Sequence, residues 1–285
     1  MSVGAAQTAI GPMVVVAVEQ YEDSPLVRDE LAAAVLPLSA RIIIRCARLG
    51  FVRRFLVAAT EQKIRGMWAG MLCRKRYIDD RLAAAVDVGV EAVVILGAGF
   101  DTRGYRLPGT PVFEVDLPAN IERKRAAVRR IHADAPDHVT LVPIDFETQD
   151  LADVLAEHGY RAGAKTFFVW EGVTQYLTAD GVRATMEFLA KASSGSGLVF
   201  TYVRQDFLDG LELDGGEAAY REFVVKRRLW HFGLMPDEVA GFLAPHGWHV
   251  VEQAGSAEHT DRYVAPSGRA LPVSGIERCV HAVRA

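Results

Sequence analysis

Residues 91–203 alternate between short apolar segments and longer amphipathic ones, and this alternation limits the fold more than any other feature of the sequence. The apolar segments predict five strands, over Ala92–Leu96, Val112–Val115, Val139–Ile144, Thr166–Trp170 and Gly197–Val203. The amphipathic segments predict three helices, over Pro118–His132, Gln149–His158 and Thr178–Ala192. Because apolar strands that alternate with helices form parallel sheets covered on both faces, the sequence predicts an α/β fold.

The first 90 residues differ from this pattern, and their sequence predicts helices. Apolar residues at helical spacing predict helices over Asp29–Leu38 and Gly66–Val88. Between Arg41 and Arg81 there are 11 basic residues and 3 acidic ones, a local charge of +8. One interpretation is a solvated helical face whose long side chains lie over apolar surface. The other is a cap that attracts an anionic substrate or a membrane surface.

The C-terminal residues add further elements to the α/β pattern. Helices are predicted over Gly216–Arg228 and Pro236–Leu243, and strands over His246–Val251 and Cys279–Val283. We therefore expect an N-terminal helical cap over residues 1–90 and a core over residues 91–285, folded together as one integrated domain.

Composition excludes several classes of protein. The chain has 285 residues, of which 50% are hydrophobic, and a formal net charge of −4, so neither a disordered chain nor a nucleic-acid-binding protein is expected. Cys46, Cys73 and Cys279 are far apart and form no CxxC pair, which predicts free thiols in a reducing cytoplasm and no metal site. The apolar run Met13–Val18 is too short to span a bilayer, and no signal peptide is recognisable.

A glycine turn after the first predicted strand is the strongest local signal. The segment VVILGAGFDTR places Gly97, Ala98 and Gly99 where a strand ends, and glycines there let a ligand approach the backbone closely. Asp116 ends the second strand, 19 residues after Gly97, where a carboxylate can accept both hydroxyl hydrogens of a ribose. The structural alternative is a tight strand–helix turn followed by a solvated acid.

The identity of this nucleoside ligand follows from the residues around the turn. A dinucleotide fingerprint requires a third glycine where the chain has Thr102, and Asp101 puts a negative charge where a pyrophosphate would lie. About 90 residues also precede the first strand, whereas dinucleotide-binding domains commonly begin near it. S-adenosylmethionine, which carries an ammonium group and no phosphate, fits better, and an NAD(P)-dependent enzyme is the alternative.

Two more strand ends carry carboxylates. Asp145 and Phe146 follow the third strand, where an acid can accept from an adenine amino group and an aromatic ring can cover the base. Their structural alternative is a polar strand end and a core phenylalanine. Glu171 follows the fourth strand, at the edge where open α/β sheets bind ligands, and would pair with a positive group of the ligand. A buried carboxylate beside so apolar a strand is costly unless it is paired.

Four motifs in this order resemble the leucine carboxyl methyltransferase family. They are RKRYIDDRL, GAGFDTR, FEVDLP and WEGVTQYLT, and the resemblance extends over roughly residues 5–285 through PDEVAGFLAPHGWHV and RYVAPSGRAL. That family includes enzymes that methylate the C-terminal leucine of phosphatases, tetracenomycin-type polyketide O-methyltransferases and many actinobacterial methyltransferases. The resemblance implies a class I methyltransferase (Rossmann-like) fold: a seven-stranded, mostly parallel sheet with one antiparallel strand near the C-terminus and an N-terminal helical cap.

The resemblance also implies S-adenosyl-L-methionine as cofactor and assigns its contacts. Gly97 and its neighbours would contact the methionine part, Asp116 the ribose, and Glu171 the amino group, while Arg74, with Arg76 as a competitor, would bind the carboxylate. Asp145 and Phe146 would flank the adenine. The complete expected set is Arg74, Gly97, Ala98, Gly99, Asp101, Asp116, Leu117, Asp145, Phe146 and Glu171.

The expected reaction is methyl transfer to a carboxylate or hydroxyl of a small, apolar or polyketide-like or lipid-like acceptor, in a cytoplasmic enzyme. A carboxylate is already ionised and needs no general base, whereas a hydroxyl would benefit from one. Tyr202, Arg204 and His231 are the weak candidates for acceptor binding or catalysis. A binding protein that kept the fold and lost the chemistry is the alternative from another class. The basic cap weakly favours an acidic acceptor.

Overall fold

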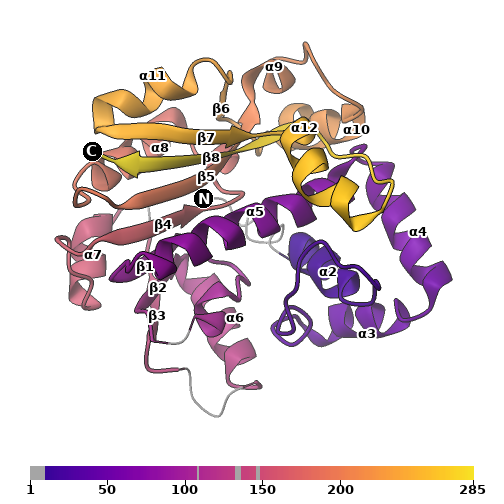
Figure 1. Ribbon diagram of the computed structural model, residues 1–285, viewed down its shortest axis with the longest axis horizontal. Helices are drawn as coiled ribbons and strands as arrows, with labels where there is room; N and C mark the ends of the chain where they lie inside the picture. The colour runs from indigo at the N-terminus through magenta and orange to yellow at the C-terminus, as the bar shows by residue number, and fades with distance from the viewer. Residues whose placement is uncertain (1–9, 108, 132–135, 146–147) are drawn as a thin grey trace.

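The computed structural model describes residues 10–107, 109–131, 136–145 and 148–285, and it contains one large sheet. The strands follow the order β3-β2-β1-β4-β5-β8-β7, with a two-residue strand, β6, paired to the end of β5 (Figure 1). Their bounds are β1 Ala92–Leu96, β2 Val112–Asp116, β3 Val139–Pro143, β4 Thr166–Trp170, β5 Gly197–Arg204, β6 Gly233–Leu234, β7 Trp248–Ala254 and β8 Glu277–Arg284. Strand β8 runs antiparallel to both β5 and β7, and the other strand pairs are parallel. The expected sheet with one antiparallel strand is confirmed, and β6 is an addition to it.

The central strands are buried on both faces, which explains why they are apolar without interruption. Every residue of β1 and β4 is buried. Along β1, Val93 and Ile95 belong to one hydrophobic core, whereas Ala92, Val94 and Leu96 belong to a second core. Successive side chains of a strand point to opposite faces, so these two cores lie on opposite sides of the sheet.

Helices surround the sheet, and the N-terminal ones form a group of their own. This group consists of α2 Ile10–Glu19, α3 Leu38–Cys46, α4 Gly50–Glu61 and α5 Met67–Asp87. The core adds α6 Pro118–Val128, α7 Leu151–Glu157, α8 Ala179–Leu189, α9 Gln205–Leu208, α10 Glu217–Ala219, α11 Val239–Leu243 and α12 Ser256–His259. Short 3-10 turns are η1 Arg103–Arg106, η2 Thr174–Tyr176, η4 Ala244–His246 and η6 Ala265–Ser267, and π-helical segments are η3 Tyr220–Lys226 and η5 Thr260–Val264.

The prediction of a helix over Asp29–Leu38 is wrong. Residues 30–36 form turns and a bend, and α3 begins only at Leu38. Pro37 is the reason, because its ring clashes with a preceding helical turn and also disfavours helical geometry at Leu36. Pro37 itself is extended, with φ −64° and ψ 158°, and precedes the first residue of α3. The helix predicted over Gly216–Arg228 is instead the short α10 followed by the π-helical η3.

Helix α5 joins the N-terminal helices to the sheet. In Figure 1 it crosses one face of the sheet, while α2, α3 and α4 lie beyond its N-terminal half. Tyr77 and Ile78 of α5 share a hydrophobic core with Val15 of α2 and with Val169 and Val199 of the sheet. The N-terminal helices therefore complete the core on this face of the sheet. Among the described residues, no helix has the length and apolar character needed to cross a membrane.

Candidate functional site

A cavity of about 450 Å³ lies where β1, β2 and β4 end, at the edge of the sheet where α/β proteins bind ligands. One part of its wall comes from the residues that follow these strands, including Gly97, Ala98, Gly99 and Asp116. The opposite part comes from α2, α5, the start of β8 and the segment that precedes β8. The cavity is therefore closed by the N-terminal helices on one side and by the sheet on the other.

The glycine turn exposes backbone to this cavity because no side chain fits there. Gly97 has φ +73° and Gly99 has φ +45°, in the left-handed region that residues with a Cβ rarely adopt. A Cβ at Gly97 would lie 2.4 Å from Val173 Cγ2. Gly97 is thus required for both conformation and space, and the backbone of the turn lines the cavity.

Asp116 is oriented by three N–H groups of its own chain. Oδ2 accepts from Gly99 N at 2.6 Å, while Oδ1 accepts from Leu117 N at 2.7 Å and from Asn120 Nδ2 at 2.8 Å. The residue is only 3% exposed and lines the cavity. An ionised carboxylate offers about four acceptor positions, so Asp116 retains capacity to accept from a hydroxyl group.

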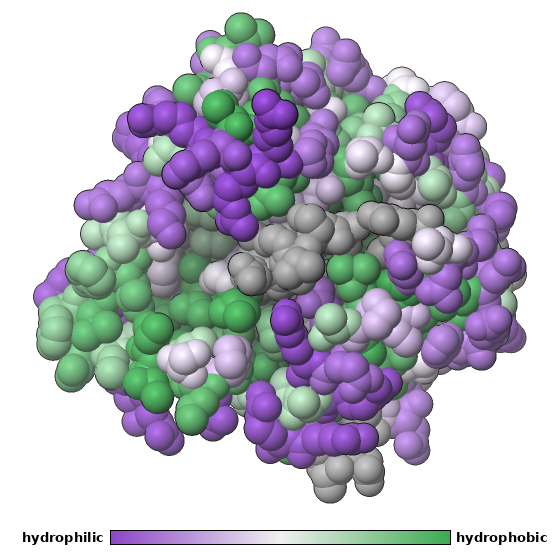
Figure 2. All heavy atoms as spheres, turned by 180° about the vertical axis from the view of Figure 1, so that it is seen from behind, coloured by the Kyte–Doolittle hydropathy of each residue, from purple (hydrophilic) through white to green (hydrophobic). Residues whose placement is uncertain are grey.

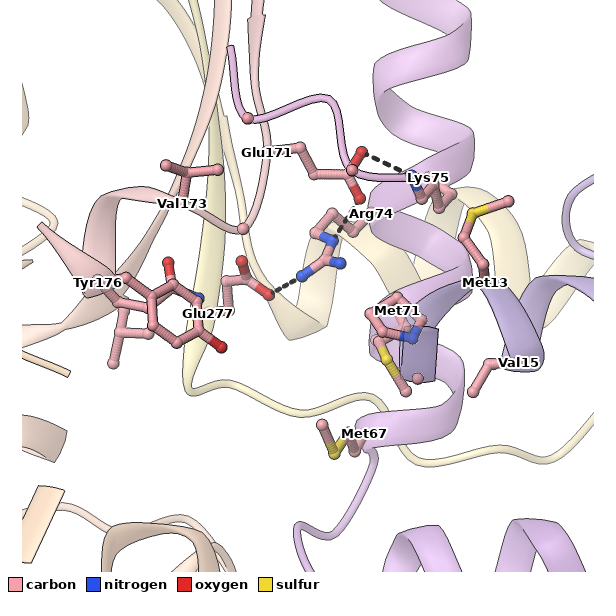
Figure 3. Close-up of a pocket in the computed structure, with 18 of the residues that line it drawn as sticks. Met13, Val15, Met67, Met71, Arg74, Lys75, Glu171, Val173, Tyr176 and Glu277 are labelled. Carbon is pink, nitrogen blue, oxygen red and sulfur yellow. Dashed lines mark hydrogen bonds and ion pairs between the residues drawn. The ribbon is translucent and has the colours of Figure 1, made fainter. Parts of the chain in front are cut away.

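A network of buried ion pairs lies next to the glycine turn (Figure 3). Arg74 Nε donates to Glu171 Oε1 at 2.8 Å, and Arg74 Nη1 donates to Glu277 Oε2 at 2.5 Å. Arg103 Nη1 donates to Glu171 Oε2 at 2.7 Å, and Lys75 Nζ lies 3.1 Å from the same oxygen. Burial alone would raise the pKa of Glu171, but Lys75, Arg103 and Arg74 together lower it to about 2. Glu171 is therefore ionised at neutral pH.

Asp101 belongs to the same network. Its Oδ2 accepts from Arg103 Nη1 at 2.6 Å, and its Oδ1 accepts from Arg103 N at 2.7 Å. Burial opposes its ionisation, but Arg103 and Lys75 hold the pKa of Asp101 well below its usual range. Arg103, which is 1% exposed, thus joins the carboxylates that follow β1 and β4.

The remaining wall of the cavity is largely apolar. Met13 of α2 and Met67 and Met71 of α5 line one side, and Val173 and Tyr176 lie across from them in Figure 3. Aromatic residues continue this wall, with Trp230 stacked on Phe223 at 5.0 Å between ring centroids. Methionine side chains adapt to ligands of different shape, so this part of the cavity is suited to an apolar group.

Comparison with known proteins places the chain in a family. Residues 9–190 match the family model of leucine carboxyl methyltransferases. The chain belongs to the leucine carboxyl methyltransferase family. It is 31% identical over 259 residues to a Streptomyces coelicolor protein named as an S-adenosyl-L-methionine-dependent methyltransferase, covering 85% of this chain and 82% of that protein. A Mycobacterium ulcerans protein of the same name is 30% identical over 292 residues, covering 93% and 89%.

The fold also matches a solved methyltransferase. The structure of magnesium protoporphyrin IX methyltransferase from Synechocystis with bound SAH superposes with a TM-score of 0.50 at 12% identity, covering 76% of this chain and 86% of that one. The expected class I fold, family and cofactor are thus confirmed: the protein is an S-adenosylmethionine-dependent methyltransferase. An NAD(P)-dependent enzyme does not fit this family.

In this methyltransferase, several residues assigned to the cofactor from sequence do line the cavity. They are Arg74, Gly97, Ala98, Gly99, Asp101, Asp116 and Glu171. Arg76, the competitor of Arg74, is different: it is exposed and pairs with Asp80 at 2.7 Å, so only Arg74 of the two reaches the cavity. Their roles toward the cofactor remain predictions.

Two other assigned residues, Leu117 and Asp145, are not among the residues that line the cavity. Leu117 contributes its N–H to Asp116. Asp145 lies two residues after the end of β3, where its N–H donates to Gln149 Oε1 at 2.9 Å, and it is not among the cavity residues. Phe146 lies outside the described residues.

The three weak catalytic candidates lie away from the cavity wall. Tyr202 is fully buried in the sheet, and its hydroxyl donates to Gln253 Oε1 at 3.0 Å. Arg204 holds Asp206 with two hydrogen bonds of 2.9 and 2.8 Å, and His231 is exposed. None of them is among the residues that line the cavity.

The structure adds residues that the sequence did not single out. Glu277 of β8 reaches the cavity beside Arg74, and its Oε1 is buried with no hydrogen-bond partner among the described residues. His259 also lines the cavity, is 3% exposed, and packs its ring edge-on against Tyr77. Lys63 lines the cavity from an exposed position after α4. A charged residue at a strand end is a usable signal for Glu277, whereas nothing local marks the other two.

Proposed function

We propose that this methyltransferase transfers the methyl group to a carboxylate oxygen of a small, apolar acid. The observation that carries the proposal is Lys63, which lines the cavity next to its apolar wall. Among the described residues, no carboxylate lies within 4.0 Å of the Lys63 ammonium, in contrast to Lys75 and Arg74, which are paired within the protein. Lys63 is therefore available to attract an acidic acceptor.

The apolar wall supplies the second part of the proposed specificity. Met67, Met71 and Ile276 face the same cavity as Lys63, together with Phe223 and Trp230. An acceptor with a carboxylate and a hydrocarbon or polyketide-like body would bury its apolar part against these residues at about 25 cal/mol per Å². A short polar acid would gain little from them.

The residues of the site fit the cofactor that the family implies. S-adenosylmethionine supplies a methyl group on a sulfonium when it is bound. In the proposed arrangement Asp116 accepts from a ribose hydroxyl, and the amino acid part lies along the backbone of Gly97 and Gly99. Arg74 binds the cofactor carboxylate through charge-assisted hydrogen bonds. Lys75 and Arg103 remain paired with Glu171. The carboxylate of Glu171 can still accept a hydrogen bond from the ammonium group of the cofactor.

The proposed reaction needs no general base, because a carboxylate acceptor is ionised at neutral pH. The task of the protein is then to align the acceptor with the methyl group and to exclude water. The walls provided by α2 and α5 serve this exclusion, since they cover the cavity with apolar side chains. Charge on the acceptor is neutralised as the methyl group is transferred, which an apolar environment favours.

The test is a transfer assay with isotopically labelled cofactor and matched pairs of fatty acids and fatty alcohols. We expect labelled methyl esters from the acids. Lys63→Ala should raise KM for the acid by about fivefold, corresponding to roughly 1 kcal/mol for a charge-assisted contact, and should leave kcat nearly unchanged. Lys191→Ala, which removes an exposed lysine outside the cavity, is the control.

A second acceptor class is favoured by one observation. His259 lines the cavity, and its buried Nδ1 has no hydrogen-bond partner among the described residues, so it offers an acceptor for the proton of a hydroxyl. Burial lowers the pKa of His259 to about 4, which keeps the ring neutral at pH 7 and makes it a weak base. Label appearing only in the alcohol products would contradict the carboxylate proposal and assign this base. In that case His259→Gln should abolish most of the alcohol methylation.

A further inference from the structure

Helices α3 and α4 carry an exposed apolar and basic surface that methyl transfer does not use. Leu38 is 70% exposed, Ile42 56%, Phe51 64% and Phe55 71%. Arginines lie between these residues on both helices. We call this surface the α3–α4 face, and it comprises Leu38, Arg41, Ile42, Ile43, Arg45, Leu49, Phe51, Arg54 and Phe55. Figure 2 shows apolar residues gathered on the side of the molecule that these helices form.

The same spacing of residues occurs on both helices. In α3, Leu38, Arg41 and Ile42 occupy positions i, i+3 and i+4, and in α4 Phe51, Arg54 and Phe55 do the same. Residues at this spacing lie together on one side of a helix. Each helix therefore presents two large apolar side chains with an arginine between them.

These apolar side chains are not required to hold the helices in place. Helix α3 packs through its other side, where Ala40 and Ile44 are buried. Helix α4 packs through Val52 and Leu56, which contact the hydrophobic core. Exposed large apolar residues that gather on one surface commonly mark a site of contact with a partner.

The charge of this face selects the class of partner. Residues 31–60 contain five arginines and no aspartate or glutamate. Arg41, Arg45 and Arg54 have no carboxylate within 4.0 Å among the described residues, whereas Arg53 is paired with Glu22 at 2.9 Å. The partner must therefore supply negative charge as well as an apolar interior.

We propose that the α3–α4 face binds the surface of an anionic lipid membrane. Apolar side chains with interspersed arginines match the boundary between anionic headgroups and acyl chains. A second copy of this chain fits less well, because a twofold interface would place these unpaired arginines against each other. The face is also not hollowed by either described cavity, so it suits a deformable surface better than an inserted peptide.

The position of the cavity suggests a role for membrane contact in substrate delivery. This step of the proposal rests on the function proposed above. Thr60 near the end of α4 and Lys63 just after it both line the cavity. The helix that carries Phe51 and Phe55 therefore leads to the site where we place the acceptor carboxylate. An apolar acid dissolved in the membrane would reach the cavity without crossing bulk water.

Sedimentation with lipid vesicles tests the proposal. We expect the full chain to sediment with phosphatidylcholine vesicles containing about one third phosphatidylglycerol, to bind pure phosphatidylcholine weakly, and to be released by salt. The double variant Phe51→Ser/Phe55→Ser should lose about tenfold or more in vesicle affinity, because neither position would then bury an aromatic side chain among the acyl chains. Leu211→Ser, at a residue 74% exposed on another segment, should bind as the wild type does.

Two results would overturn the membrane proposal. One is equal vesicle binding by the double variant and by Leu211→Ser. The other is a dimer, detected by light scattering, that the double variant dissociates, which would assign the face to a second copy. The double variant should retain its melting temperature and its turnover of a water-soluble acid. Failure of carboxylate methylation would leave vesicle binding intact, so the two proposals fail separately.

Discussion

The Asp116 carboxylate is held by three N–H groups of its own chain, so its direction is set by the glycine turn and by the start of α6. We expect Asp116→Ala to weaken binding of S-adenosylhomocysteine by roughly tenfold to a hundredfold, because the ribose loses this charged acceptor. Isothermal titration calorimetry measures this change. Glu122→Ala, on the exposed side of α6, is the matched control, and equal affinity of the two variants would contradict the assignment of Asp116.

Buried His259 gives the protein a stability that depends on pH. Burial lowers its pKa from 6.5 to about 4, so between these values the unfolded chain binds a proton that the folded chain does not. Stability is therefore retained above pH 6.5 and falls as the pH drops toward 4, by up to about 1.4 kcal/mol per pH unit from this group. His259→Phe should show a shallower decline in urea unfolding over this range. If stability declined equally in the wild type and in His259→Phe, the role of His259 would be contradicted. His249→Phe is the control for the loss of an exposed histidine.

The residues that line the cavity at the edge of the sheet could be predicted from sequence, because they lie where predicted strands end. Gly97, Asp116 and Glu171 each lie where an apolar strand stops, and parallel strands bring such ends to one edge. The roles within the ion network could not be predicted this way. Glu171 contacts Arg74 of α5 and Arg103 of η1, and these pairings depend on helix packing that no short motif encodes.

Among the elements, the turn between β1 and η1 is the least tolerant of change. Gly97→Ala would place a Cβ 2.4 Å from Val173 Cγ2 at a φ of +73°. We expect a loss of about 2–4 kcal/mol in the free energy of unfolding, of which about 1–2 kcal/mol is left-handed strain. Urea unfolding measures it.

A double variant separates the two causes. Val173→Ala removes the clashing methyl group, and the nearest remaining atom of that side chain, its Cβ, lies 3.5 Å from the Cβ added at position 97. Gly97→Ala/Val173→Ala should therefore relieve the clash and keep the conformational strain. If the double variant lost as much free energy of unfolding as the two single variants lose together, this explanation would be contradicted.

Elements with uniform burial were predictable, and those shaped by single residues were not. The strands of the central sheet match their predicted bounds closely because both faces are buried. The segment before α3 was mispredicted because the apolar spacing of residues 29–38 outweighed Pro37 in the sequence pattern. An α-helix is predicted over η3 because apolar residues at helical spacing do not distinguish an α-helical from a π-helical hydrogen-bond pattern.

At the scale of the whole molecule, the N-terminal helices and the sheet share one hydrophobic core. Val15 and Leu36 belong to the same cluster as Ile95 and Val169. We expect circular dichroism and tryptophan fluorescence to report the same single thermal transition. Unfolding of either the N-terminal helices or the sheet would expose the core that the two share. Two separate transitions would contradict the shared core.

The same arrangement predicts a response to ligand. Since the cavity is lined from both parts, S-adenosylhomocysteine at about 100 times its Kd should stabilise the entire fold by about 2.7 kcal/mol. The melting temperature should rise by a few degrees and remain a single transition. Gly97→Ala, which disturbs the cavity wall, should show a smaller rise, whereas Leu211→Ser should match the wild type.

Strand β8 pairs with β5 on one side and with β7 on the other. During translation, β5 and β7 are both made before residues 277–284, so their facing edges stay open until that strand leaves the ribosome. Assembly of this half of the sheet therefore waits for residues 277–284, and the nascent chain exposes two unsatisfied strand edges in the meantime. A stalled or shortened polypeptide lacking these eight residues would expose the same edges and would be prone to aggregate.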